Sequence, residues 1–228
     1  MKKLEKYYKD YKNKLEELGI SGLACDIDNT ITNTSVHFAS ELIKKFGNPE
    51  NLNPEEIIKK YKIVENVPYW QEDKTKIWIQ NFIKSPEEVS RIPLIDGVKY
   101  YLHGLNSLVP IGGYITARPK NLEKVTRELI INEEMPNKGI GVIMRPSNEE
   151  LMDMGIDSVD EWKPLLLDYL YPQIIGIVDD EIKHAQAVKV NYPGRYYLLG
   201  YEKAPKCLIS VVTCPAWKDV LREVGRYN

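Results

Sequence analysis

Four aspartates follow two apolar segments of this 228-residue chain, and their arrangement suits metal chemistry. Asp26 and Asp28 lie at the end of the run GLACDI, while Asp179 and Asp180 follow the run IIGIV. Carboxylates brought close together repel one another unless a cation or a shared proton compensates them. Because Mg²⁺ prefers oxygen ligands, we expect a Mg²⁺ ion where the two pairs meet.

Taken alone, each pair has a simpler interpretation. A D-x-D pair is more often a solvated turn or a helix cap than a metal site. Asp179 and Asp180 could likewise cap the helix that follows them, where negative charge is favourable. The metal interpretation depends on the fold, because only the sheet topology can bring the two pairs together.

The elements that must position these residues alternate between strands and helices. Four apolar runs predict buried strands at 22–27, 111–115, 140–144 and 174–178, and two weaker runs lie at 196–199 and 209–212. Helical periodicity predicts helices at 3–18, 98–108, 122–131, 162–170 and 182–190. This pattern predicts an α/β fold with a parallel sheet covered by helices on both faces. Such sheets bind ligands outside the carboxyl ends of their strands, which is where the aspartates lie.

Residues 33–95 interrupt the alternation with helical patterns and no convincing strand. We interpret them as a helical insertion, so that 1–32 and 96–228 form the α/β core and 33–95 form a second, inserted domain. The insertion contains nine Lys/Arg and nine Asp/Glu residues. This neutral balance argues against a groove that follows many phosphates.

Two further segments complete a set of four motifs in a fixed order. The second strand runs into TARP, which contains Thr116 and Arg118, and WKP, which contains Lys163, begins a later helix. Together with LACDIDNTIT and IIGIVDDEIKHA, these segments resemble the motifs of the haloacid dehalogenase-like (HAD) hydrolase superfamily. The resemblance spans about residues 22–187 and implies a Rossmann-like three-layer core. It also implies a small helical cap of the C1 type, inserted after the first core strand.

The resemblance implies a phosphatase mechanism with named residues. Asp26 would attack phosphorus to form an aspartyl-phosphate, and Asp28 would protonate the leaving oxygen and later deprotonate the attacking water. Thr116 and Lys163 would hold the phosphoryl oxygens. Members that cleave carbon–halogen bonds lack a carboxyl at the position of Asp28, because halide leaves without a proton. Its presence here favours phosphoryl transfer.

The resemblance also implies a set of Mg²⁺ ligands. They are Asp26, the backbone carbonyl of Asp28 and the acidic pair, with Asp180 as the direct ligand and Asp179 as a water-mediated or secondary one. His184 stands where many members have a second acid. This departure leaves the composition of the metal shell open.

Three residues are candidates for substrate binding: Asn29, Arg118 and Arg145. Asn29 replaces a glycine that is common in the family, and the two arginines follow the second and third strands. Arginines after these strands are reminiscent of phosphatases that act on nucleotides or polynucleotide ends. The alternative, left open, is that each arginine pairs with nearby acids.

Composition excludes several other classes of protein. The chain is 43% apolar and 28% charged, which is enough for a buried core. Its 31 Lys+Arg and 33 Asp+Glu give a net charge of −2, so nothing drives it toward nucleic acid or an anionic membrane. It has three cysteines, no apolar stretch of membrane-spanning length and no secretory signal, so we expect a cytoplasmic protein.

We therefore expect a Mg²⁺-dependent phosphatase of small phosphate monoesters, with a small phosphorylated metabolite or a nucleotide as substrate. One alternative is a nucleotidase or polynucleotide-end phosphatase of the same superfamily. Another is a non-catalytic protein of the same fold that binds a phosphorylated ligand. We expect neither a membrane nor a long nucleic acid as a partner, and a homo-oligomer stays open.

Overall fold

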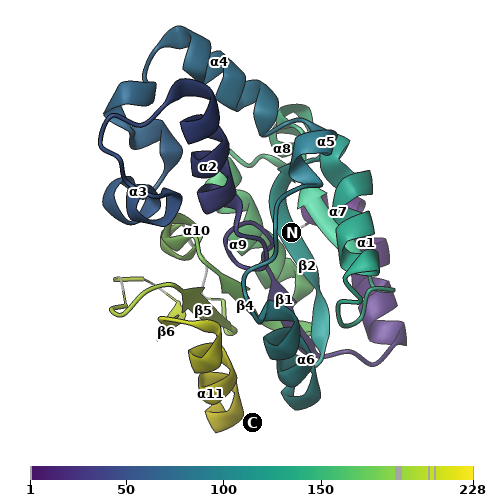
Figure 1. Ribbon diagram of the computed structural model, residues 1–228. Helices are drawn as coiled ribbons and strands as arrows, with labels where there is room; N and C mark the ends of the chain where they lie inside the picture. The colour runs from purple at the N-terminus through teal and green to yellow at the C-terminus, as the bar shows by residue number, and fades with distance from the viewer. Residues whose placement is uncertain (1, 188–191, 205, 208, 228) are drawn as a thin grey trace.

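A six-stranded sheet organises the chain, for which the computed structural model describes residues 2–187, 192–204, 206–207 and 209–227. The strand order is β3-β2-β1-β4-β5-β6, and every neighbouring pair is parallel. The strands are β1 (Gly22–Cys25), β2 (Ile111–Pro119), β3 (Val142–Arg145), β4 (Ile174–Asp179), β5 (Arg195–Leu199) and β6 (Ser210–Cys214) (Figure 1). The expected Rossmann-like α/β fold is confirmed, and the two weaker apolar runs form β5 and β6.

Helices cover both faces of the sheet, because successive strand side chains point to opposite faces. On one face, α6 (Val98–Leu108), α7 (Glu123–Asn132) and α11 (Trp217–Tyr227) share a buried cluster with Leu23 and Cys25. On the other face, α1 (Lys2–Glu17), α8 (Asn148–Met154), α9 (Val159–Leu170) and α10 (Ile182–Gln186) share one with Ala24. Residues 188–190 of the helix expected at 182–190 lie outside the described residues.

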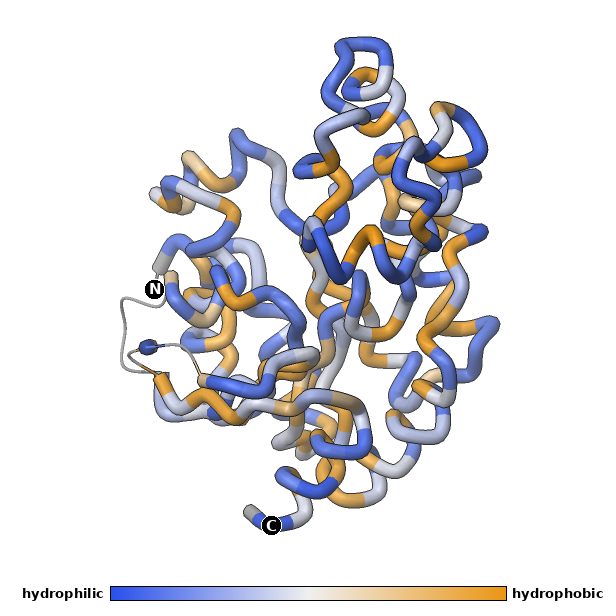
Figure 2. Tube along the Cα trace, turned by 60° about the vertical axis from the view of Figure 1, so that its left-hand side comes forward, coloured by the Kyte–Doolittle hydropathy of each residue, from blue (hydrophilic) through white to orange (hydrophobic). Residues whose placement is uncertain are grey.

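The insertion forms a helical layer beyond the carboxyl ends of the strands (Figure 1). It consists of α2 (Thr34–Phe46), α3 (Pro54–Tyr61), η1 (Val64–Asn66), η2 (Pro68–Trp70), α4 (Asp73–Phe82) and α5 (Pro86–Val89). Its helices have a buried apolar cluster of their own, which includes Leu42, Ile57 and Trp70. Hydrophobic and hydrophilic positions alternate along the helical trace, as expected for helices that bury one side (Figure 2). The domain boundaries at 33 and 95 stay a prediction.

Close packing holds the central strand in place. A Cβ atom at Gly22 would lie 2.0 Å from the carbonyl oxygen of Pro110, so only glycine fits where β1 meets the segment that enters β2.

Among the described residues, no helix is both long and apolar enough to cross a membrane.

Candidate active site

Three aspartates converge at the carboxyl ends of the central strands. Because β1 and β4 are neighbours and Cys25 pairs with Val178, the residues that follow them come together. One carboxylate oxygen from each of Asp26, Asp179 and Asp180 lies within 4.8 Å of the others, a grouping that could hold a metal ion. This point lies between β1 and β4, where the strand order changes direction: β2 and β3 extend the sheet on one side, and β4, β5 and β6 extend it on the other. Such a switch point is the usual ligand position in these folds.

Lys163 enters this cluster from α9 and contacts two of its members. Its Nζ donates to Asp26 Oδ1 and to Asp179 Oδ2, each at 2.8 Å, and its side chain is buried. The helix begins at an N-cap, Ser158, whose hydroxyl accepts from the backbone of Glu161. Burial disfavours the ammonium ion, but the two carboxylates outweigh burial and raise the pKa of Lys163. The lysine therefore stays charged and offsets part of the negative charge.

Asp179 is fully buried and contacts several residues around the cluster. Besides Lys163, it accepts a hydrogen bond from the Tyr196 hydroxyl at 2.6 Å, and it lies 3.1 Å from His184 Nδ1. Its other oxygen accepts from the backbone of Glu181 at 2.9 Å. Burial raises the pKa of Asp179, but Lys163 and His184 more than offset it and hold that pKa below its ordinary value. With these partners, Asp179 is a fixed anion that positions Lys163.

One lysine cannot compensate all three carboxylates of the cluster, and the pKa values of Asp26 and Asp180 are both raised. Burial, with Asp179 and Asp28 nearby, raises the pKa of Asp26 even though Lys163 opposes the shift. Burial, with Asp26 and Asp179 nearby, raises the pKa of Asp180 well above its usual range. The Thr30 hydroxyl donates a weak hydrogen bond to its carboxylate at 3.4 Å. An all-oxygen donor set with excess negative charge fits a hard divalent cation such as Mg²⁺.

Asp28 is not one of the three grouped carboxylates, and it pairs with Arg118. Arg118 donates from Nε to Oδ2 at 2.9 Å and from Nη2 to Oδ1 at 2.8 Å, and the Thr34 hydroxyl donates to Oδ1 at 2.7 Å. Burial raises the pKa of Asp28, but Arg118 outweighs it and keeps the pKa below its ordinary value. The structure thus places Arg118 in an ion pair, which is the alternative that the sequence left open. A role of Arg118 in substrate binding stays a prediction.

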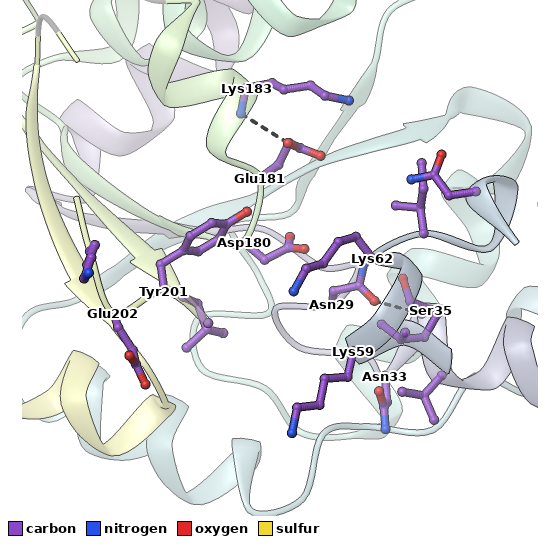
Figure 3. A pocket seen from close by; sticks show the side chains of 17 residues that line it. Asn29, Asn33, Ser35, Lys59, Lys62, Asp180, Glu181, Lys183, Tyr201 and Glu202 are labelled. Atoms are coloured by element: carbon purple, nitrogen blue, oxygen red, sulfur yellow. Dashed lines mark hydrogen bonds between the residues drawn. The ribbon is translucent and has the colours of Figure 1, made fainter. Parts of the chain in front are cut away.

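The remaining predicted residues lie around the same sheet edge. Thr116 is fully buried in β2, and its hydroxyl accepts from the backbone of Arg118 at 3.2 Å. Asn29 has a φ of 56°, a left-handed conformation that glycine or asparagine adopts with little strain. Its side chain accepts from the backbone of Ser35 at 2.8 Å and so ties the loop to α2 (Figure 3). This contact gives a physical reason for asparagine at the position.

Among the cavities formed by the described residues, three are lined by aspartates of the site. The smallest, about 240 Å³, contains Asp26, Asp28 and Asp180 together. A second, of about 360 Å³, is lined by Asp28 but not by the other two. The widest, about 900 Å³, separates α3 from the loop after β5, and Asp180 lines it. Figure 3 shows Lys62 of the insertion extending into this wide cleft on the side of Asp180.

Two contacts of Asp179 were not predicted from the sequence. Tyr196 reaches it because β5 lies beside β4, with Ile177 opposite Tyr196 in the sheet. His184 reaches it from the first turn of α10. The sequence marked His184 only as a departure from a motif, and no spacing pattern singles out Tyr196. The pairing of β4 with β5 is the signal that could have found Tyr196. The signal for His184 is its position five residues after Asp179, in the helix that follows β4.

Comparisons with known proteins find similarity in structure only. No protein-family model matches the chain, and no curated protein matches its sequence. A HAD-superfamily hydrolase from Ehrlichia chaffeensis is 15% identical, with a TM-score of 0.49, over 91% of this chain and 97% of that chain. A HAD family hydrolase from Deinococcus radiodurans R1, solved with bound phosphate and sodium, is 12% identical. Its TM-score is 0.39, over 90% of this chain and 88% of that chain.

Proposed function

We propose that this chain is a Mg²⁺-dependent phosphatase of the HAD type, which hydrolyses small phosphate monoesters through an aspartyl-phosphate on Asp26. The observation that carries the proposal is the separation of the two carboxylates of the D-x-D pair. Asp26 lies in a crowded acidic cluster with Lys163, whereas Asp28 is held apart by Arg118. Two carboxyl groups in such different environments can take different roles in one reaction.

The chain's own residues supply each step. The Asp26 carboxylate forms a bond to phosphorus as the ester oxygen departs, and Asp28 gives that oxygen its proton. Asp28 then takes a proton from a water molecule, which attacks phosphorus, breaks the acyl-phosphate bond and frees Asp26 and inorganic phosphate. Lys163 and Thr116 hold the phosphoryl oxygens throughout. Bound Mg²⁺, held by Asp26, Asp180 and the Asp28 carbonyl, would supply further positive charge to the phosphoryl group.

The low pKa of Asp28 is compatible with its two roles. In the free protein Arg118 keeps this carboxyl ionised. A phosphate group that enters beside it brings negative charge, which favours the protonated form of a neighbouring carboxyl. Substrate binding and proton uptake by Asp28 are therefore coupled in our proposal.

The cavities at the site support a small substrate, and the cysteines support a reducing environment. Cavities of about 240 and 360 Å³ suit a small phosphorylated metabolite better than a polymer. All three cysteines are free, which agrees with a cytoplasmic location.

The direct test is turnover of p-nitrophenyl phosphate with and without Mg²⁺. We expect metal-dependent release of p-nitrophenol by the unsubstituted chain and its loss in Asp26→Asn. Asp10→Asn is the matched control, since Asp10 is an exposed residue of α1, and this variant should keep full activity. Absence of turnover on this ester and on a broad panel of phosphate monoesters would favour a non-catalytic binding protein.

A further inference from the structure

The cavity of about 360 Å³ differs from the other two cavities in the catalytic residue that lines it. Asp28 lines it, whereas Asp26 and Asp180 do not. In the proposed reaction, Asp28 is the group that protonates the departing oxygen. The alcohol half of the substrate must therefore lie beside Asp28, and this cavity is lined by Asp28 without the other two aspartates.

The walls of this cavity are largely apolar and come from both parts of the chain. Phe38, Val64, Ile83 and Ile92 line it from the insertion, and Leu122 lines it from the core. Phe38 is held by an edge-to-face contact with Phe82, whose ring centre lies 5.2 Å away. Apolar and aromatic walls of this kind bind the carbon skeleton of a ligand better than they bind a ligand covered with polar groups.

An arginine with an unpaired buried N–H group, as far as the described residues show, lines the same cavity. Arg145 is the last residue of β3, and its Nε is buried with no hydrogen-bond partner among the described residues. A buried N–H group that lacks a partner is costly, so a ligand that accepts from it gains affinity. Lys84 also lines the cavity, and the one acid there besides Asp28 is the exposed Glu65. Since Arg118 already neutralises Asp28, the balance of charge favours an anionic group.

Building on the proposed function, we propose that this cavity selects phosphate monoesters whose alcohol half has an apolar body and a second anionic group, a carboxylate or a second phosphate. The apolar body contacts the walls beside Phe38, and the anionic group pairs with Arg145. This assignment gives the arginine a ligand, in contrast to Arg118, which is buried against Asp28. In this assignment the alcohol half does not bind in the wide cleft lined by Lys59 and Lys62.

Binding of three esters to the Asp26→Asn chain with Mg²⁺ tests the assignment without turnover. The probes are glycerol 1-phosphate, phenyl phosphate and 4-carboxyphenyl phosphate, measured by calorimetry. We expect affinity to rise in that order, with a gain of about tenfold or more from the carboxylate, as for a charged hydrogen bond. Adding Arg145→Met should remove that gain, and adding Arg145→Lys should restore part of it.

A lysine of the wide cleft supplies the matched control. Lys62→Met removes a positive charge close to Asp180 but outside the proposed cavity, so the preference for the carboxylated ester should persist. Equal affinities for the carboxylated and plain phenyl esters would overturn the inference, as would a preference that survives Arg145→Met or disappears in Lys62→Met. Failure of the phosphatase proposal would instead appear as no turnover of p-nitrophenyl phosphate by the unsubstituted chain.

Discussion

Arg118 donates two hydrogen bonds to Asp28, from Nε to Oδ2 at 2.9 Å and from Nη2 to Oδ1 at 2.8 Å. The arginine side chain is 5% exposed, whereas that of Asp28 is 29% exposed. The carboxylate of Asp28 is thus held by a buried arginine, while part of its own surface is exposed to the cavities. A paired arginine that fixes the orientation of a proton-transfer group is a positioning residue, and its removal should have effects that differ from those of removing the acid.

Replacing Arg118 by methionine should impair both the stability and the chemistry of the protein. Loss of the charged hydrogen bonds should lower the free energy of unfolding by about 2 kcal/mol. It should also slow turnover of p-nitrophenyl phosphate at least about tenfold, because Asp28 loses its fixed orientation. Unfolding in urea and steady-state kinetics measure the two effects.

A double-mutant cycle with Asp28→Asn distinguishes loss of the ion pair from a general destabilisation of the fold. If the ion pair is the cause, the free-energy losses of Arg118→Met and Asp28→Asn should not add, since each substitution removes the same contact. Additive losses in the double variant would mean that the two side chains act independently.

The same pair predicts a pH dependence of stability. Because the pKa of Asp28 is lowered in the folded chain, its contribution is present above the ordinary carboxyl pKa of about 3.9 and is lost as the pH falls through the folded pKa. The difference in free energy of unfolding between the unsubstituted chain and Asp28→Asn should thus be constant above about pH 5 and shrink below about pH 4. Urea unfolding in EDTA measures it. A difference that grows on acidification would show that the folded carboxyl prefers its proton.

Metal binding should stabilise the fold and should weaken in acid. A cation bound by the folded state alone raises stability by about 2.7 kcal/mol at a hundred times its dissociation constant. Since burial among like charges raises the pKa of Asp26 to about 7, protons compete with the metal below that pH. Mg²⁺ should therefore raise the melting temperature at pH 8 more than at pH 6.

Two variants make the metal prediction specific. Asp180→Asn should lose most of the Mg²⁺-induced shift, whereas Asp10→Asn on α1 should keep it. A shift of the same size in Asp180→Asn would place the metal elsewhere in the protein.

The insertion should unfold without the core. Trp70 is buried in the insertion's own cluster, and its Nε1 donates to the carbonyl of Gly47 at 3.1 Å. Trp70→Ala should cost about 3–5 kcal/mol locally. Hydrogen exchange should then accelerate in 34–83 while β1 and β4 stay protected. Trp217→Ala, which removes a buried tryptophan from the core cluster, is the contrasting variant. Equal acceleration in the sheet of Trp70→Ala would mean that insertion and core unfold as one unit.

The strands were the most predictable part of the fold, since uninterrupted apolar runs are typical of a sheet buried on both faces. Helix α8 was missed, although Ser147 and Glu150 form a capping box that marks its start. The N-cap Ser158 likewise explains why α9 begins before the expected residue 162. Short helices of this kind carry too few periodic positions for hydrophobic spacing to reveal them.

The candidate site was predictable only where residues follow strands. The sheet topology brings Asp26 and Asp179 together, so their convergence can be inferred from sequence. The pairing of Asp28 with Arg118 joins positions 90 residues apart, and the sequence offered a substrate role just as readily. Contacts of this kind depend on side-chain direction and burial, which no local pattern reveals.

The acid role of Asp28 predicts a dependence on the leaving group. In Asp28→Asn, the first step should slow by about 10²- to 10⁴-fold for phenyl phosphate, whose leaving oxygen needs a proton. It should slow far less for p-nitrophenyl phosphate, whose phenolate leaves readily. The rate of the initial burst of alcohol measures this step. Equal slowing for both esters would contradict the acid role.

The central claim is the covalent step on Asp26, and trapping tests it most directly. In Asp28→Asn, p-nitrophenyl phosphate should still phosphorylate Asp26, while hydrolysis of the intermediate lacks its base. Acid quenching with Mg²⁺ present, followed by peptide mass spectrometry, should find phosphate on Asp26 after a burst of about one equivalent of p-nitrophenol. Phosphate on another residue, or steady release of p-nitrophenol with no phosphorylated peptide, would contradict this account.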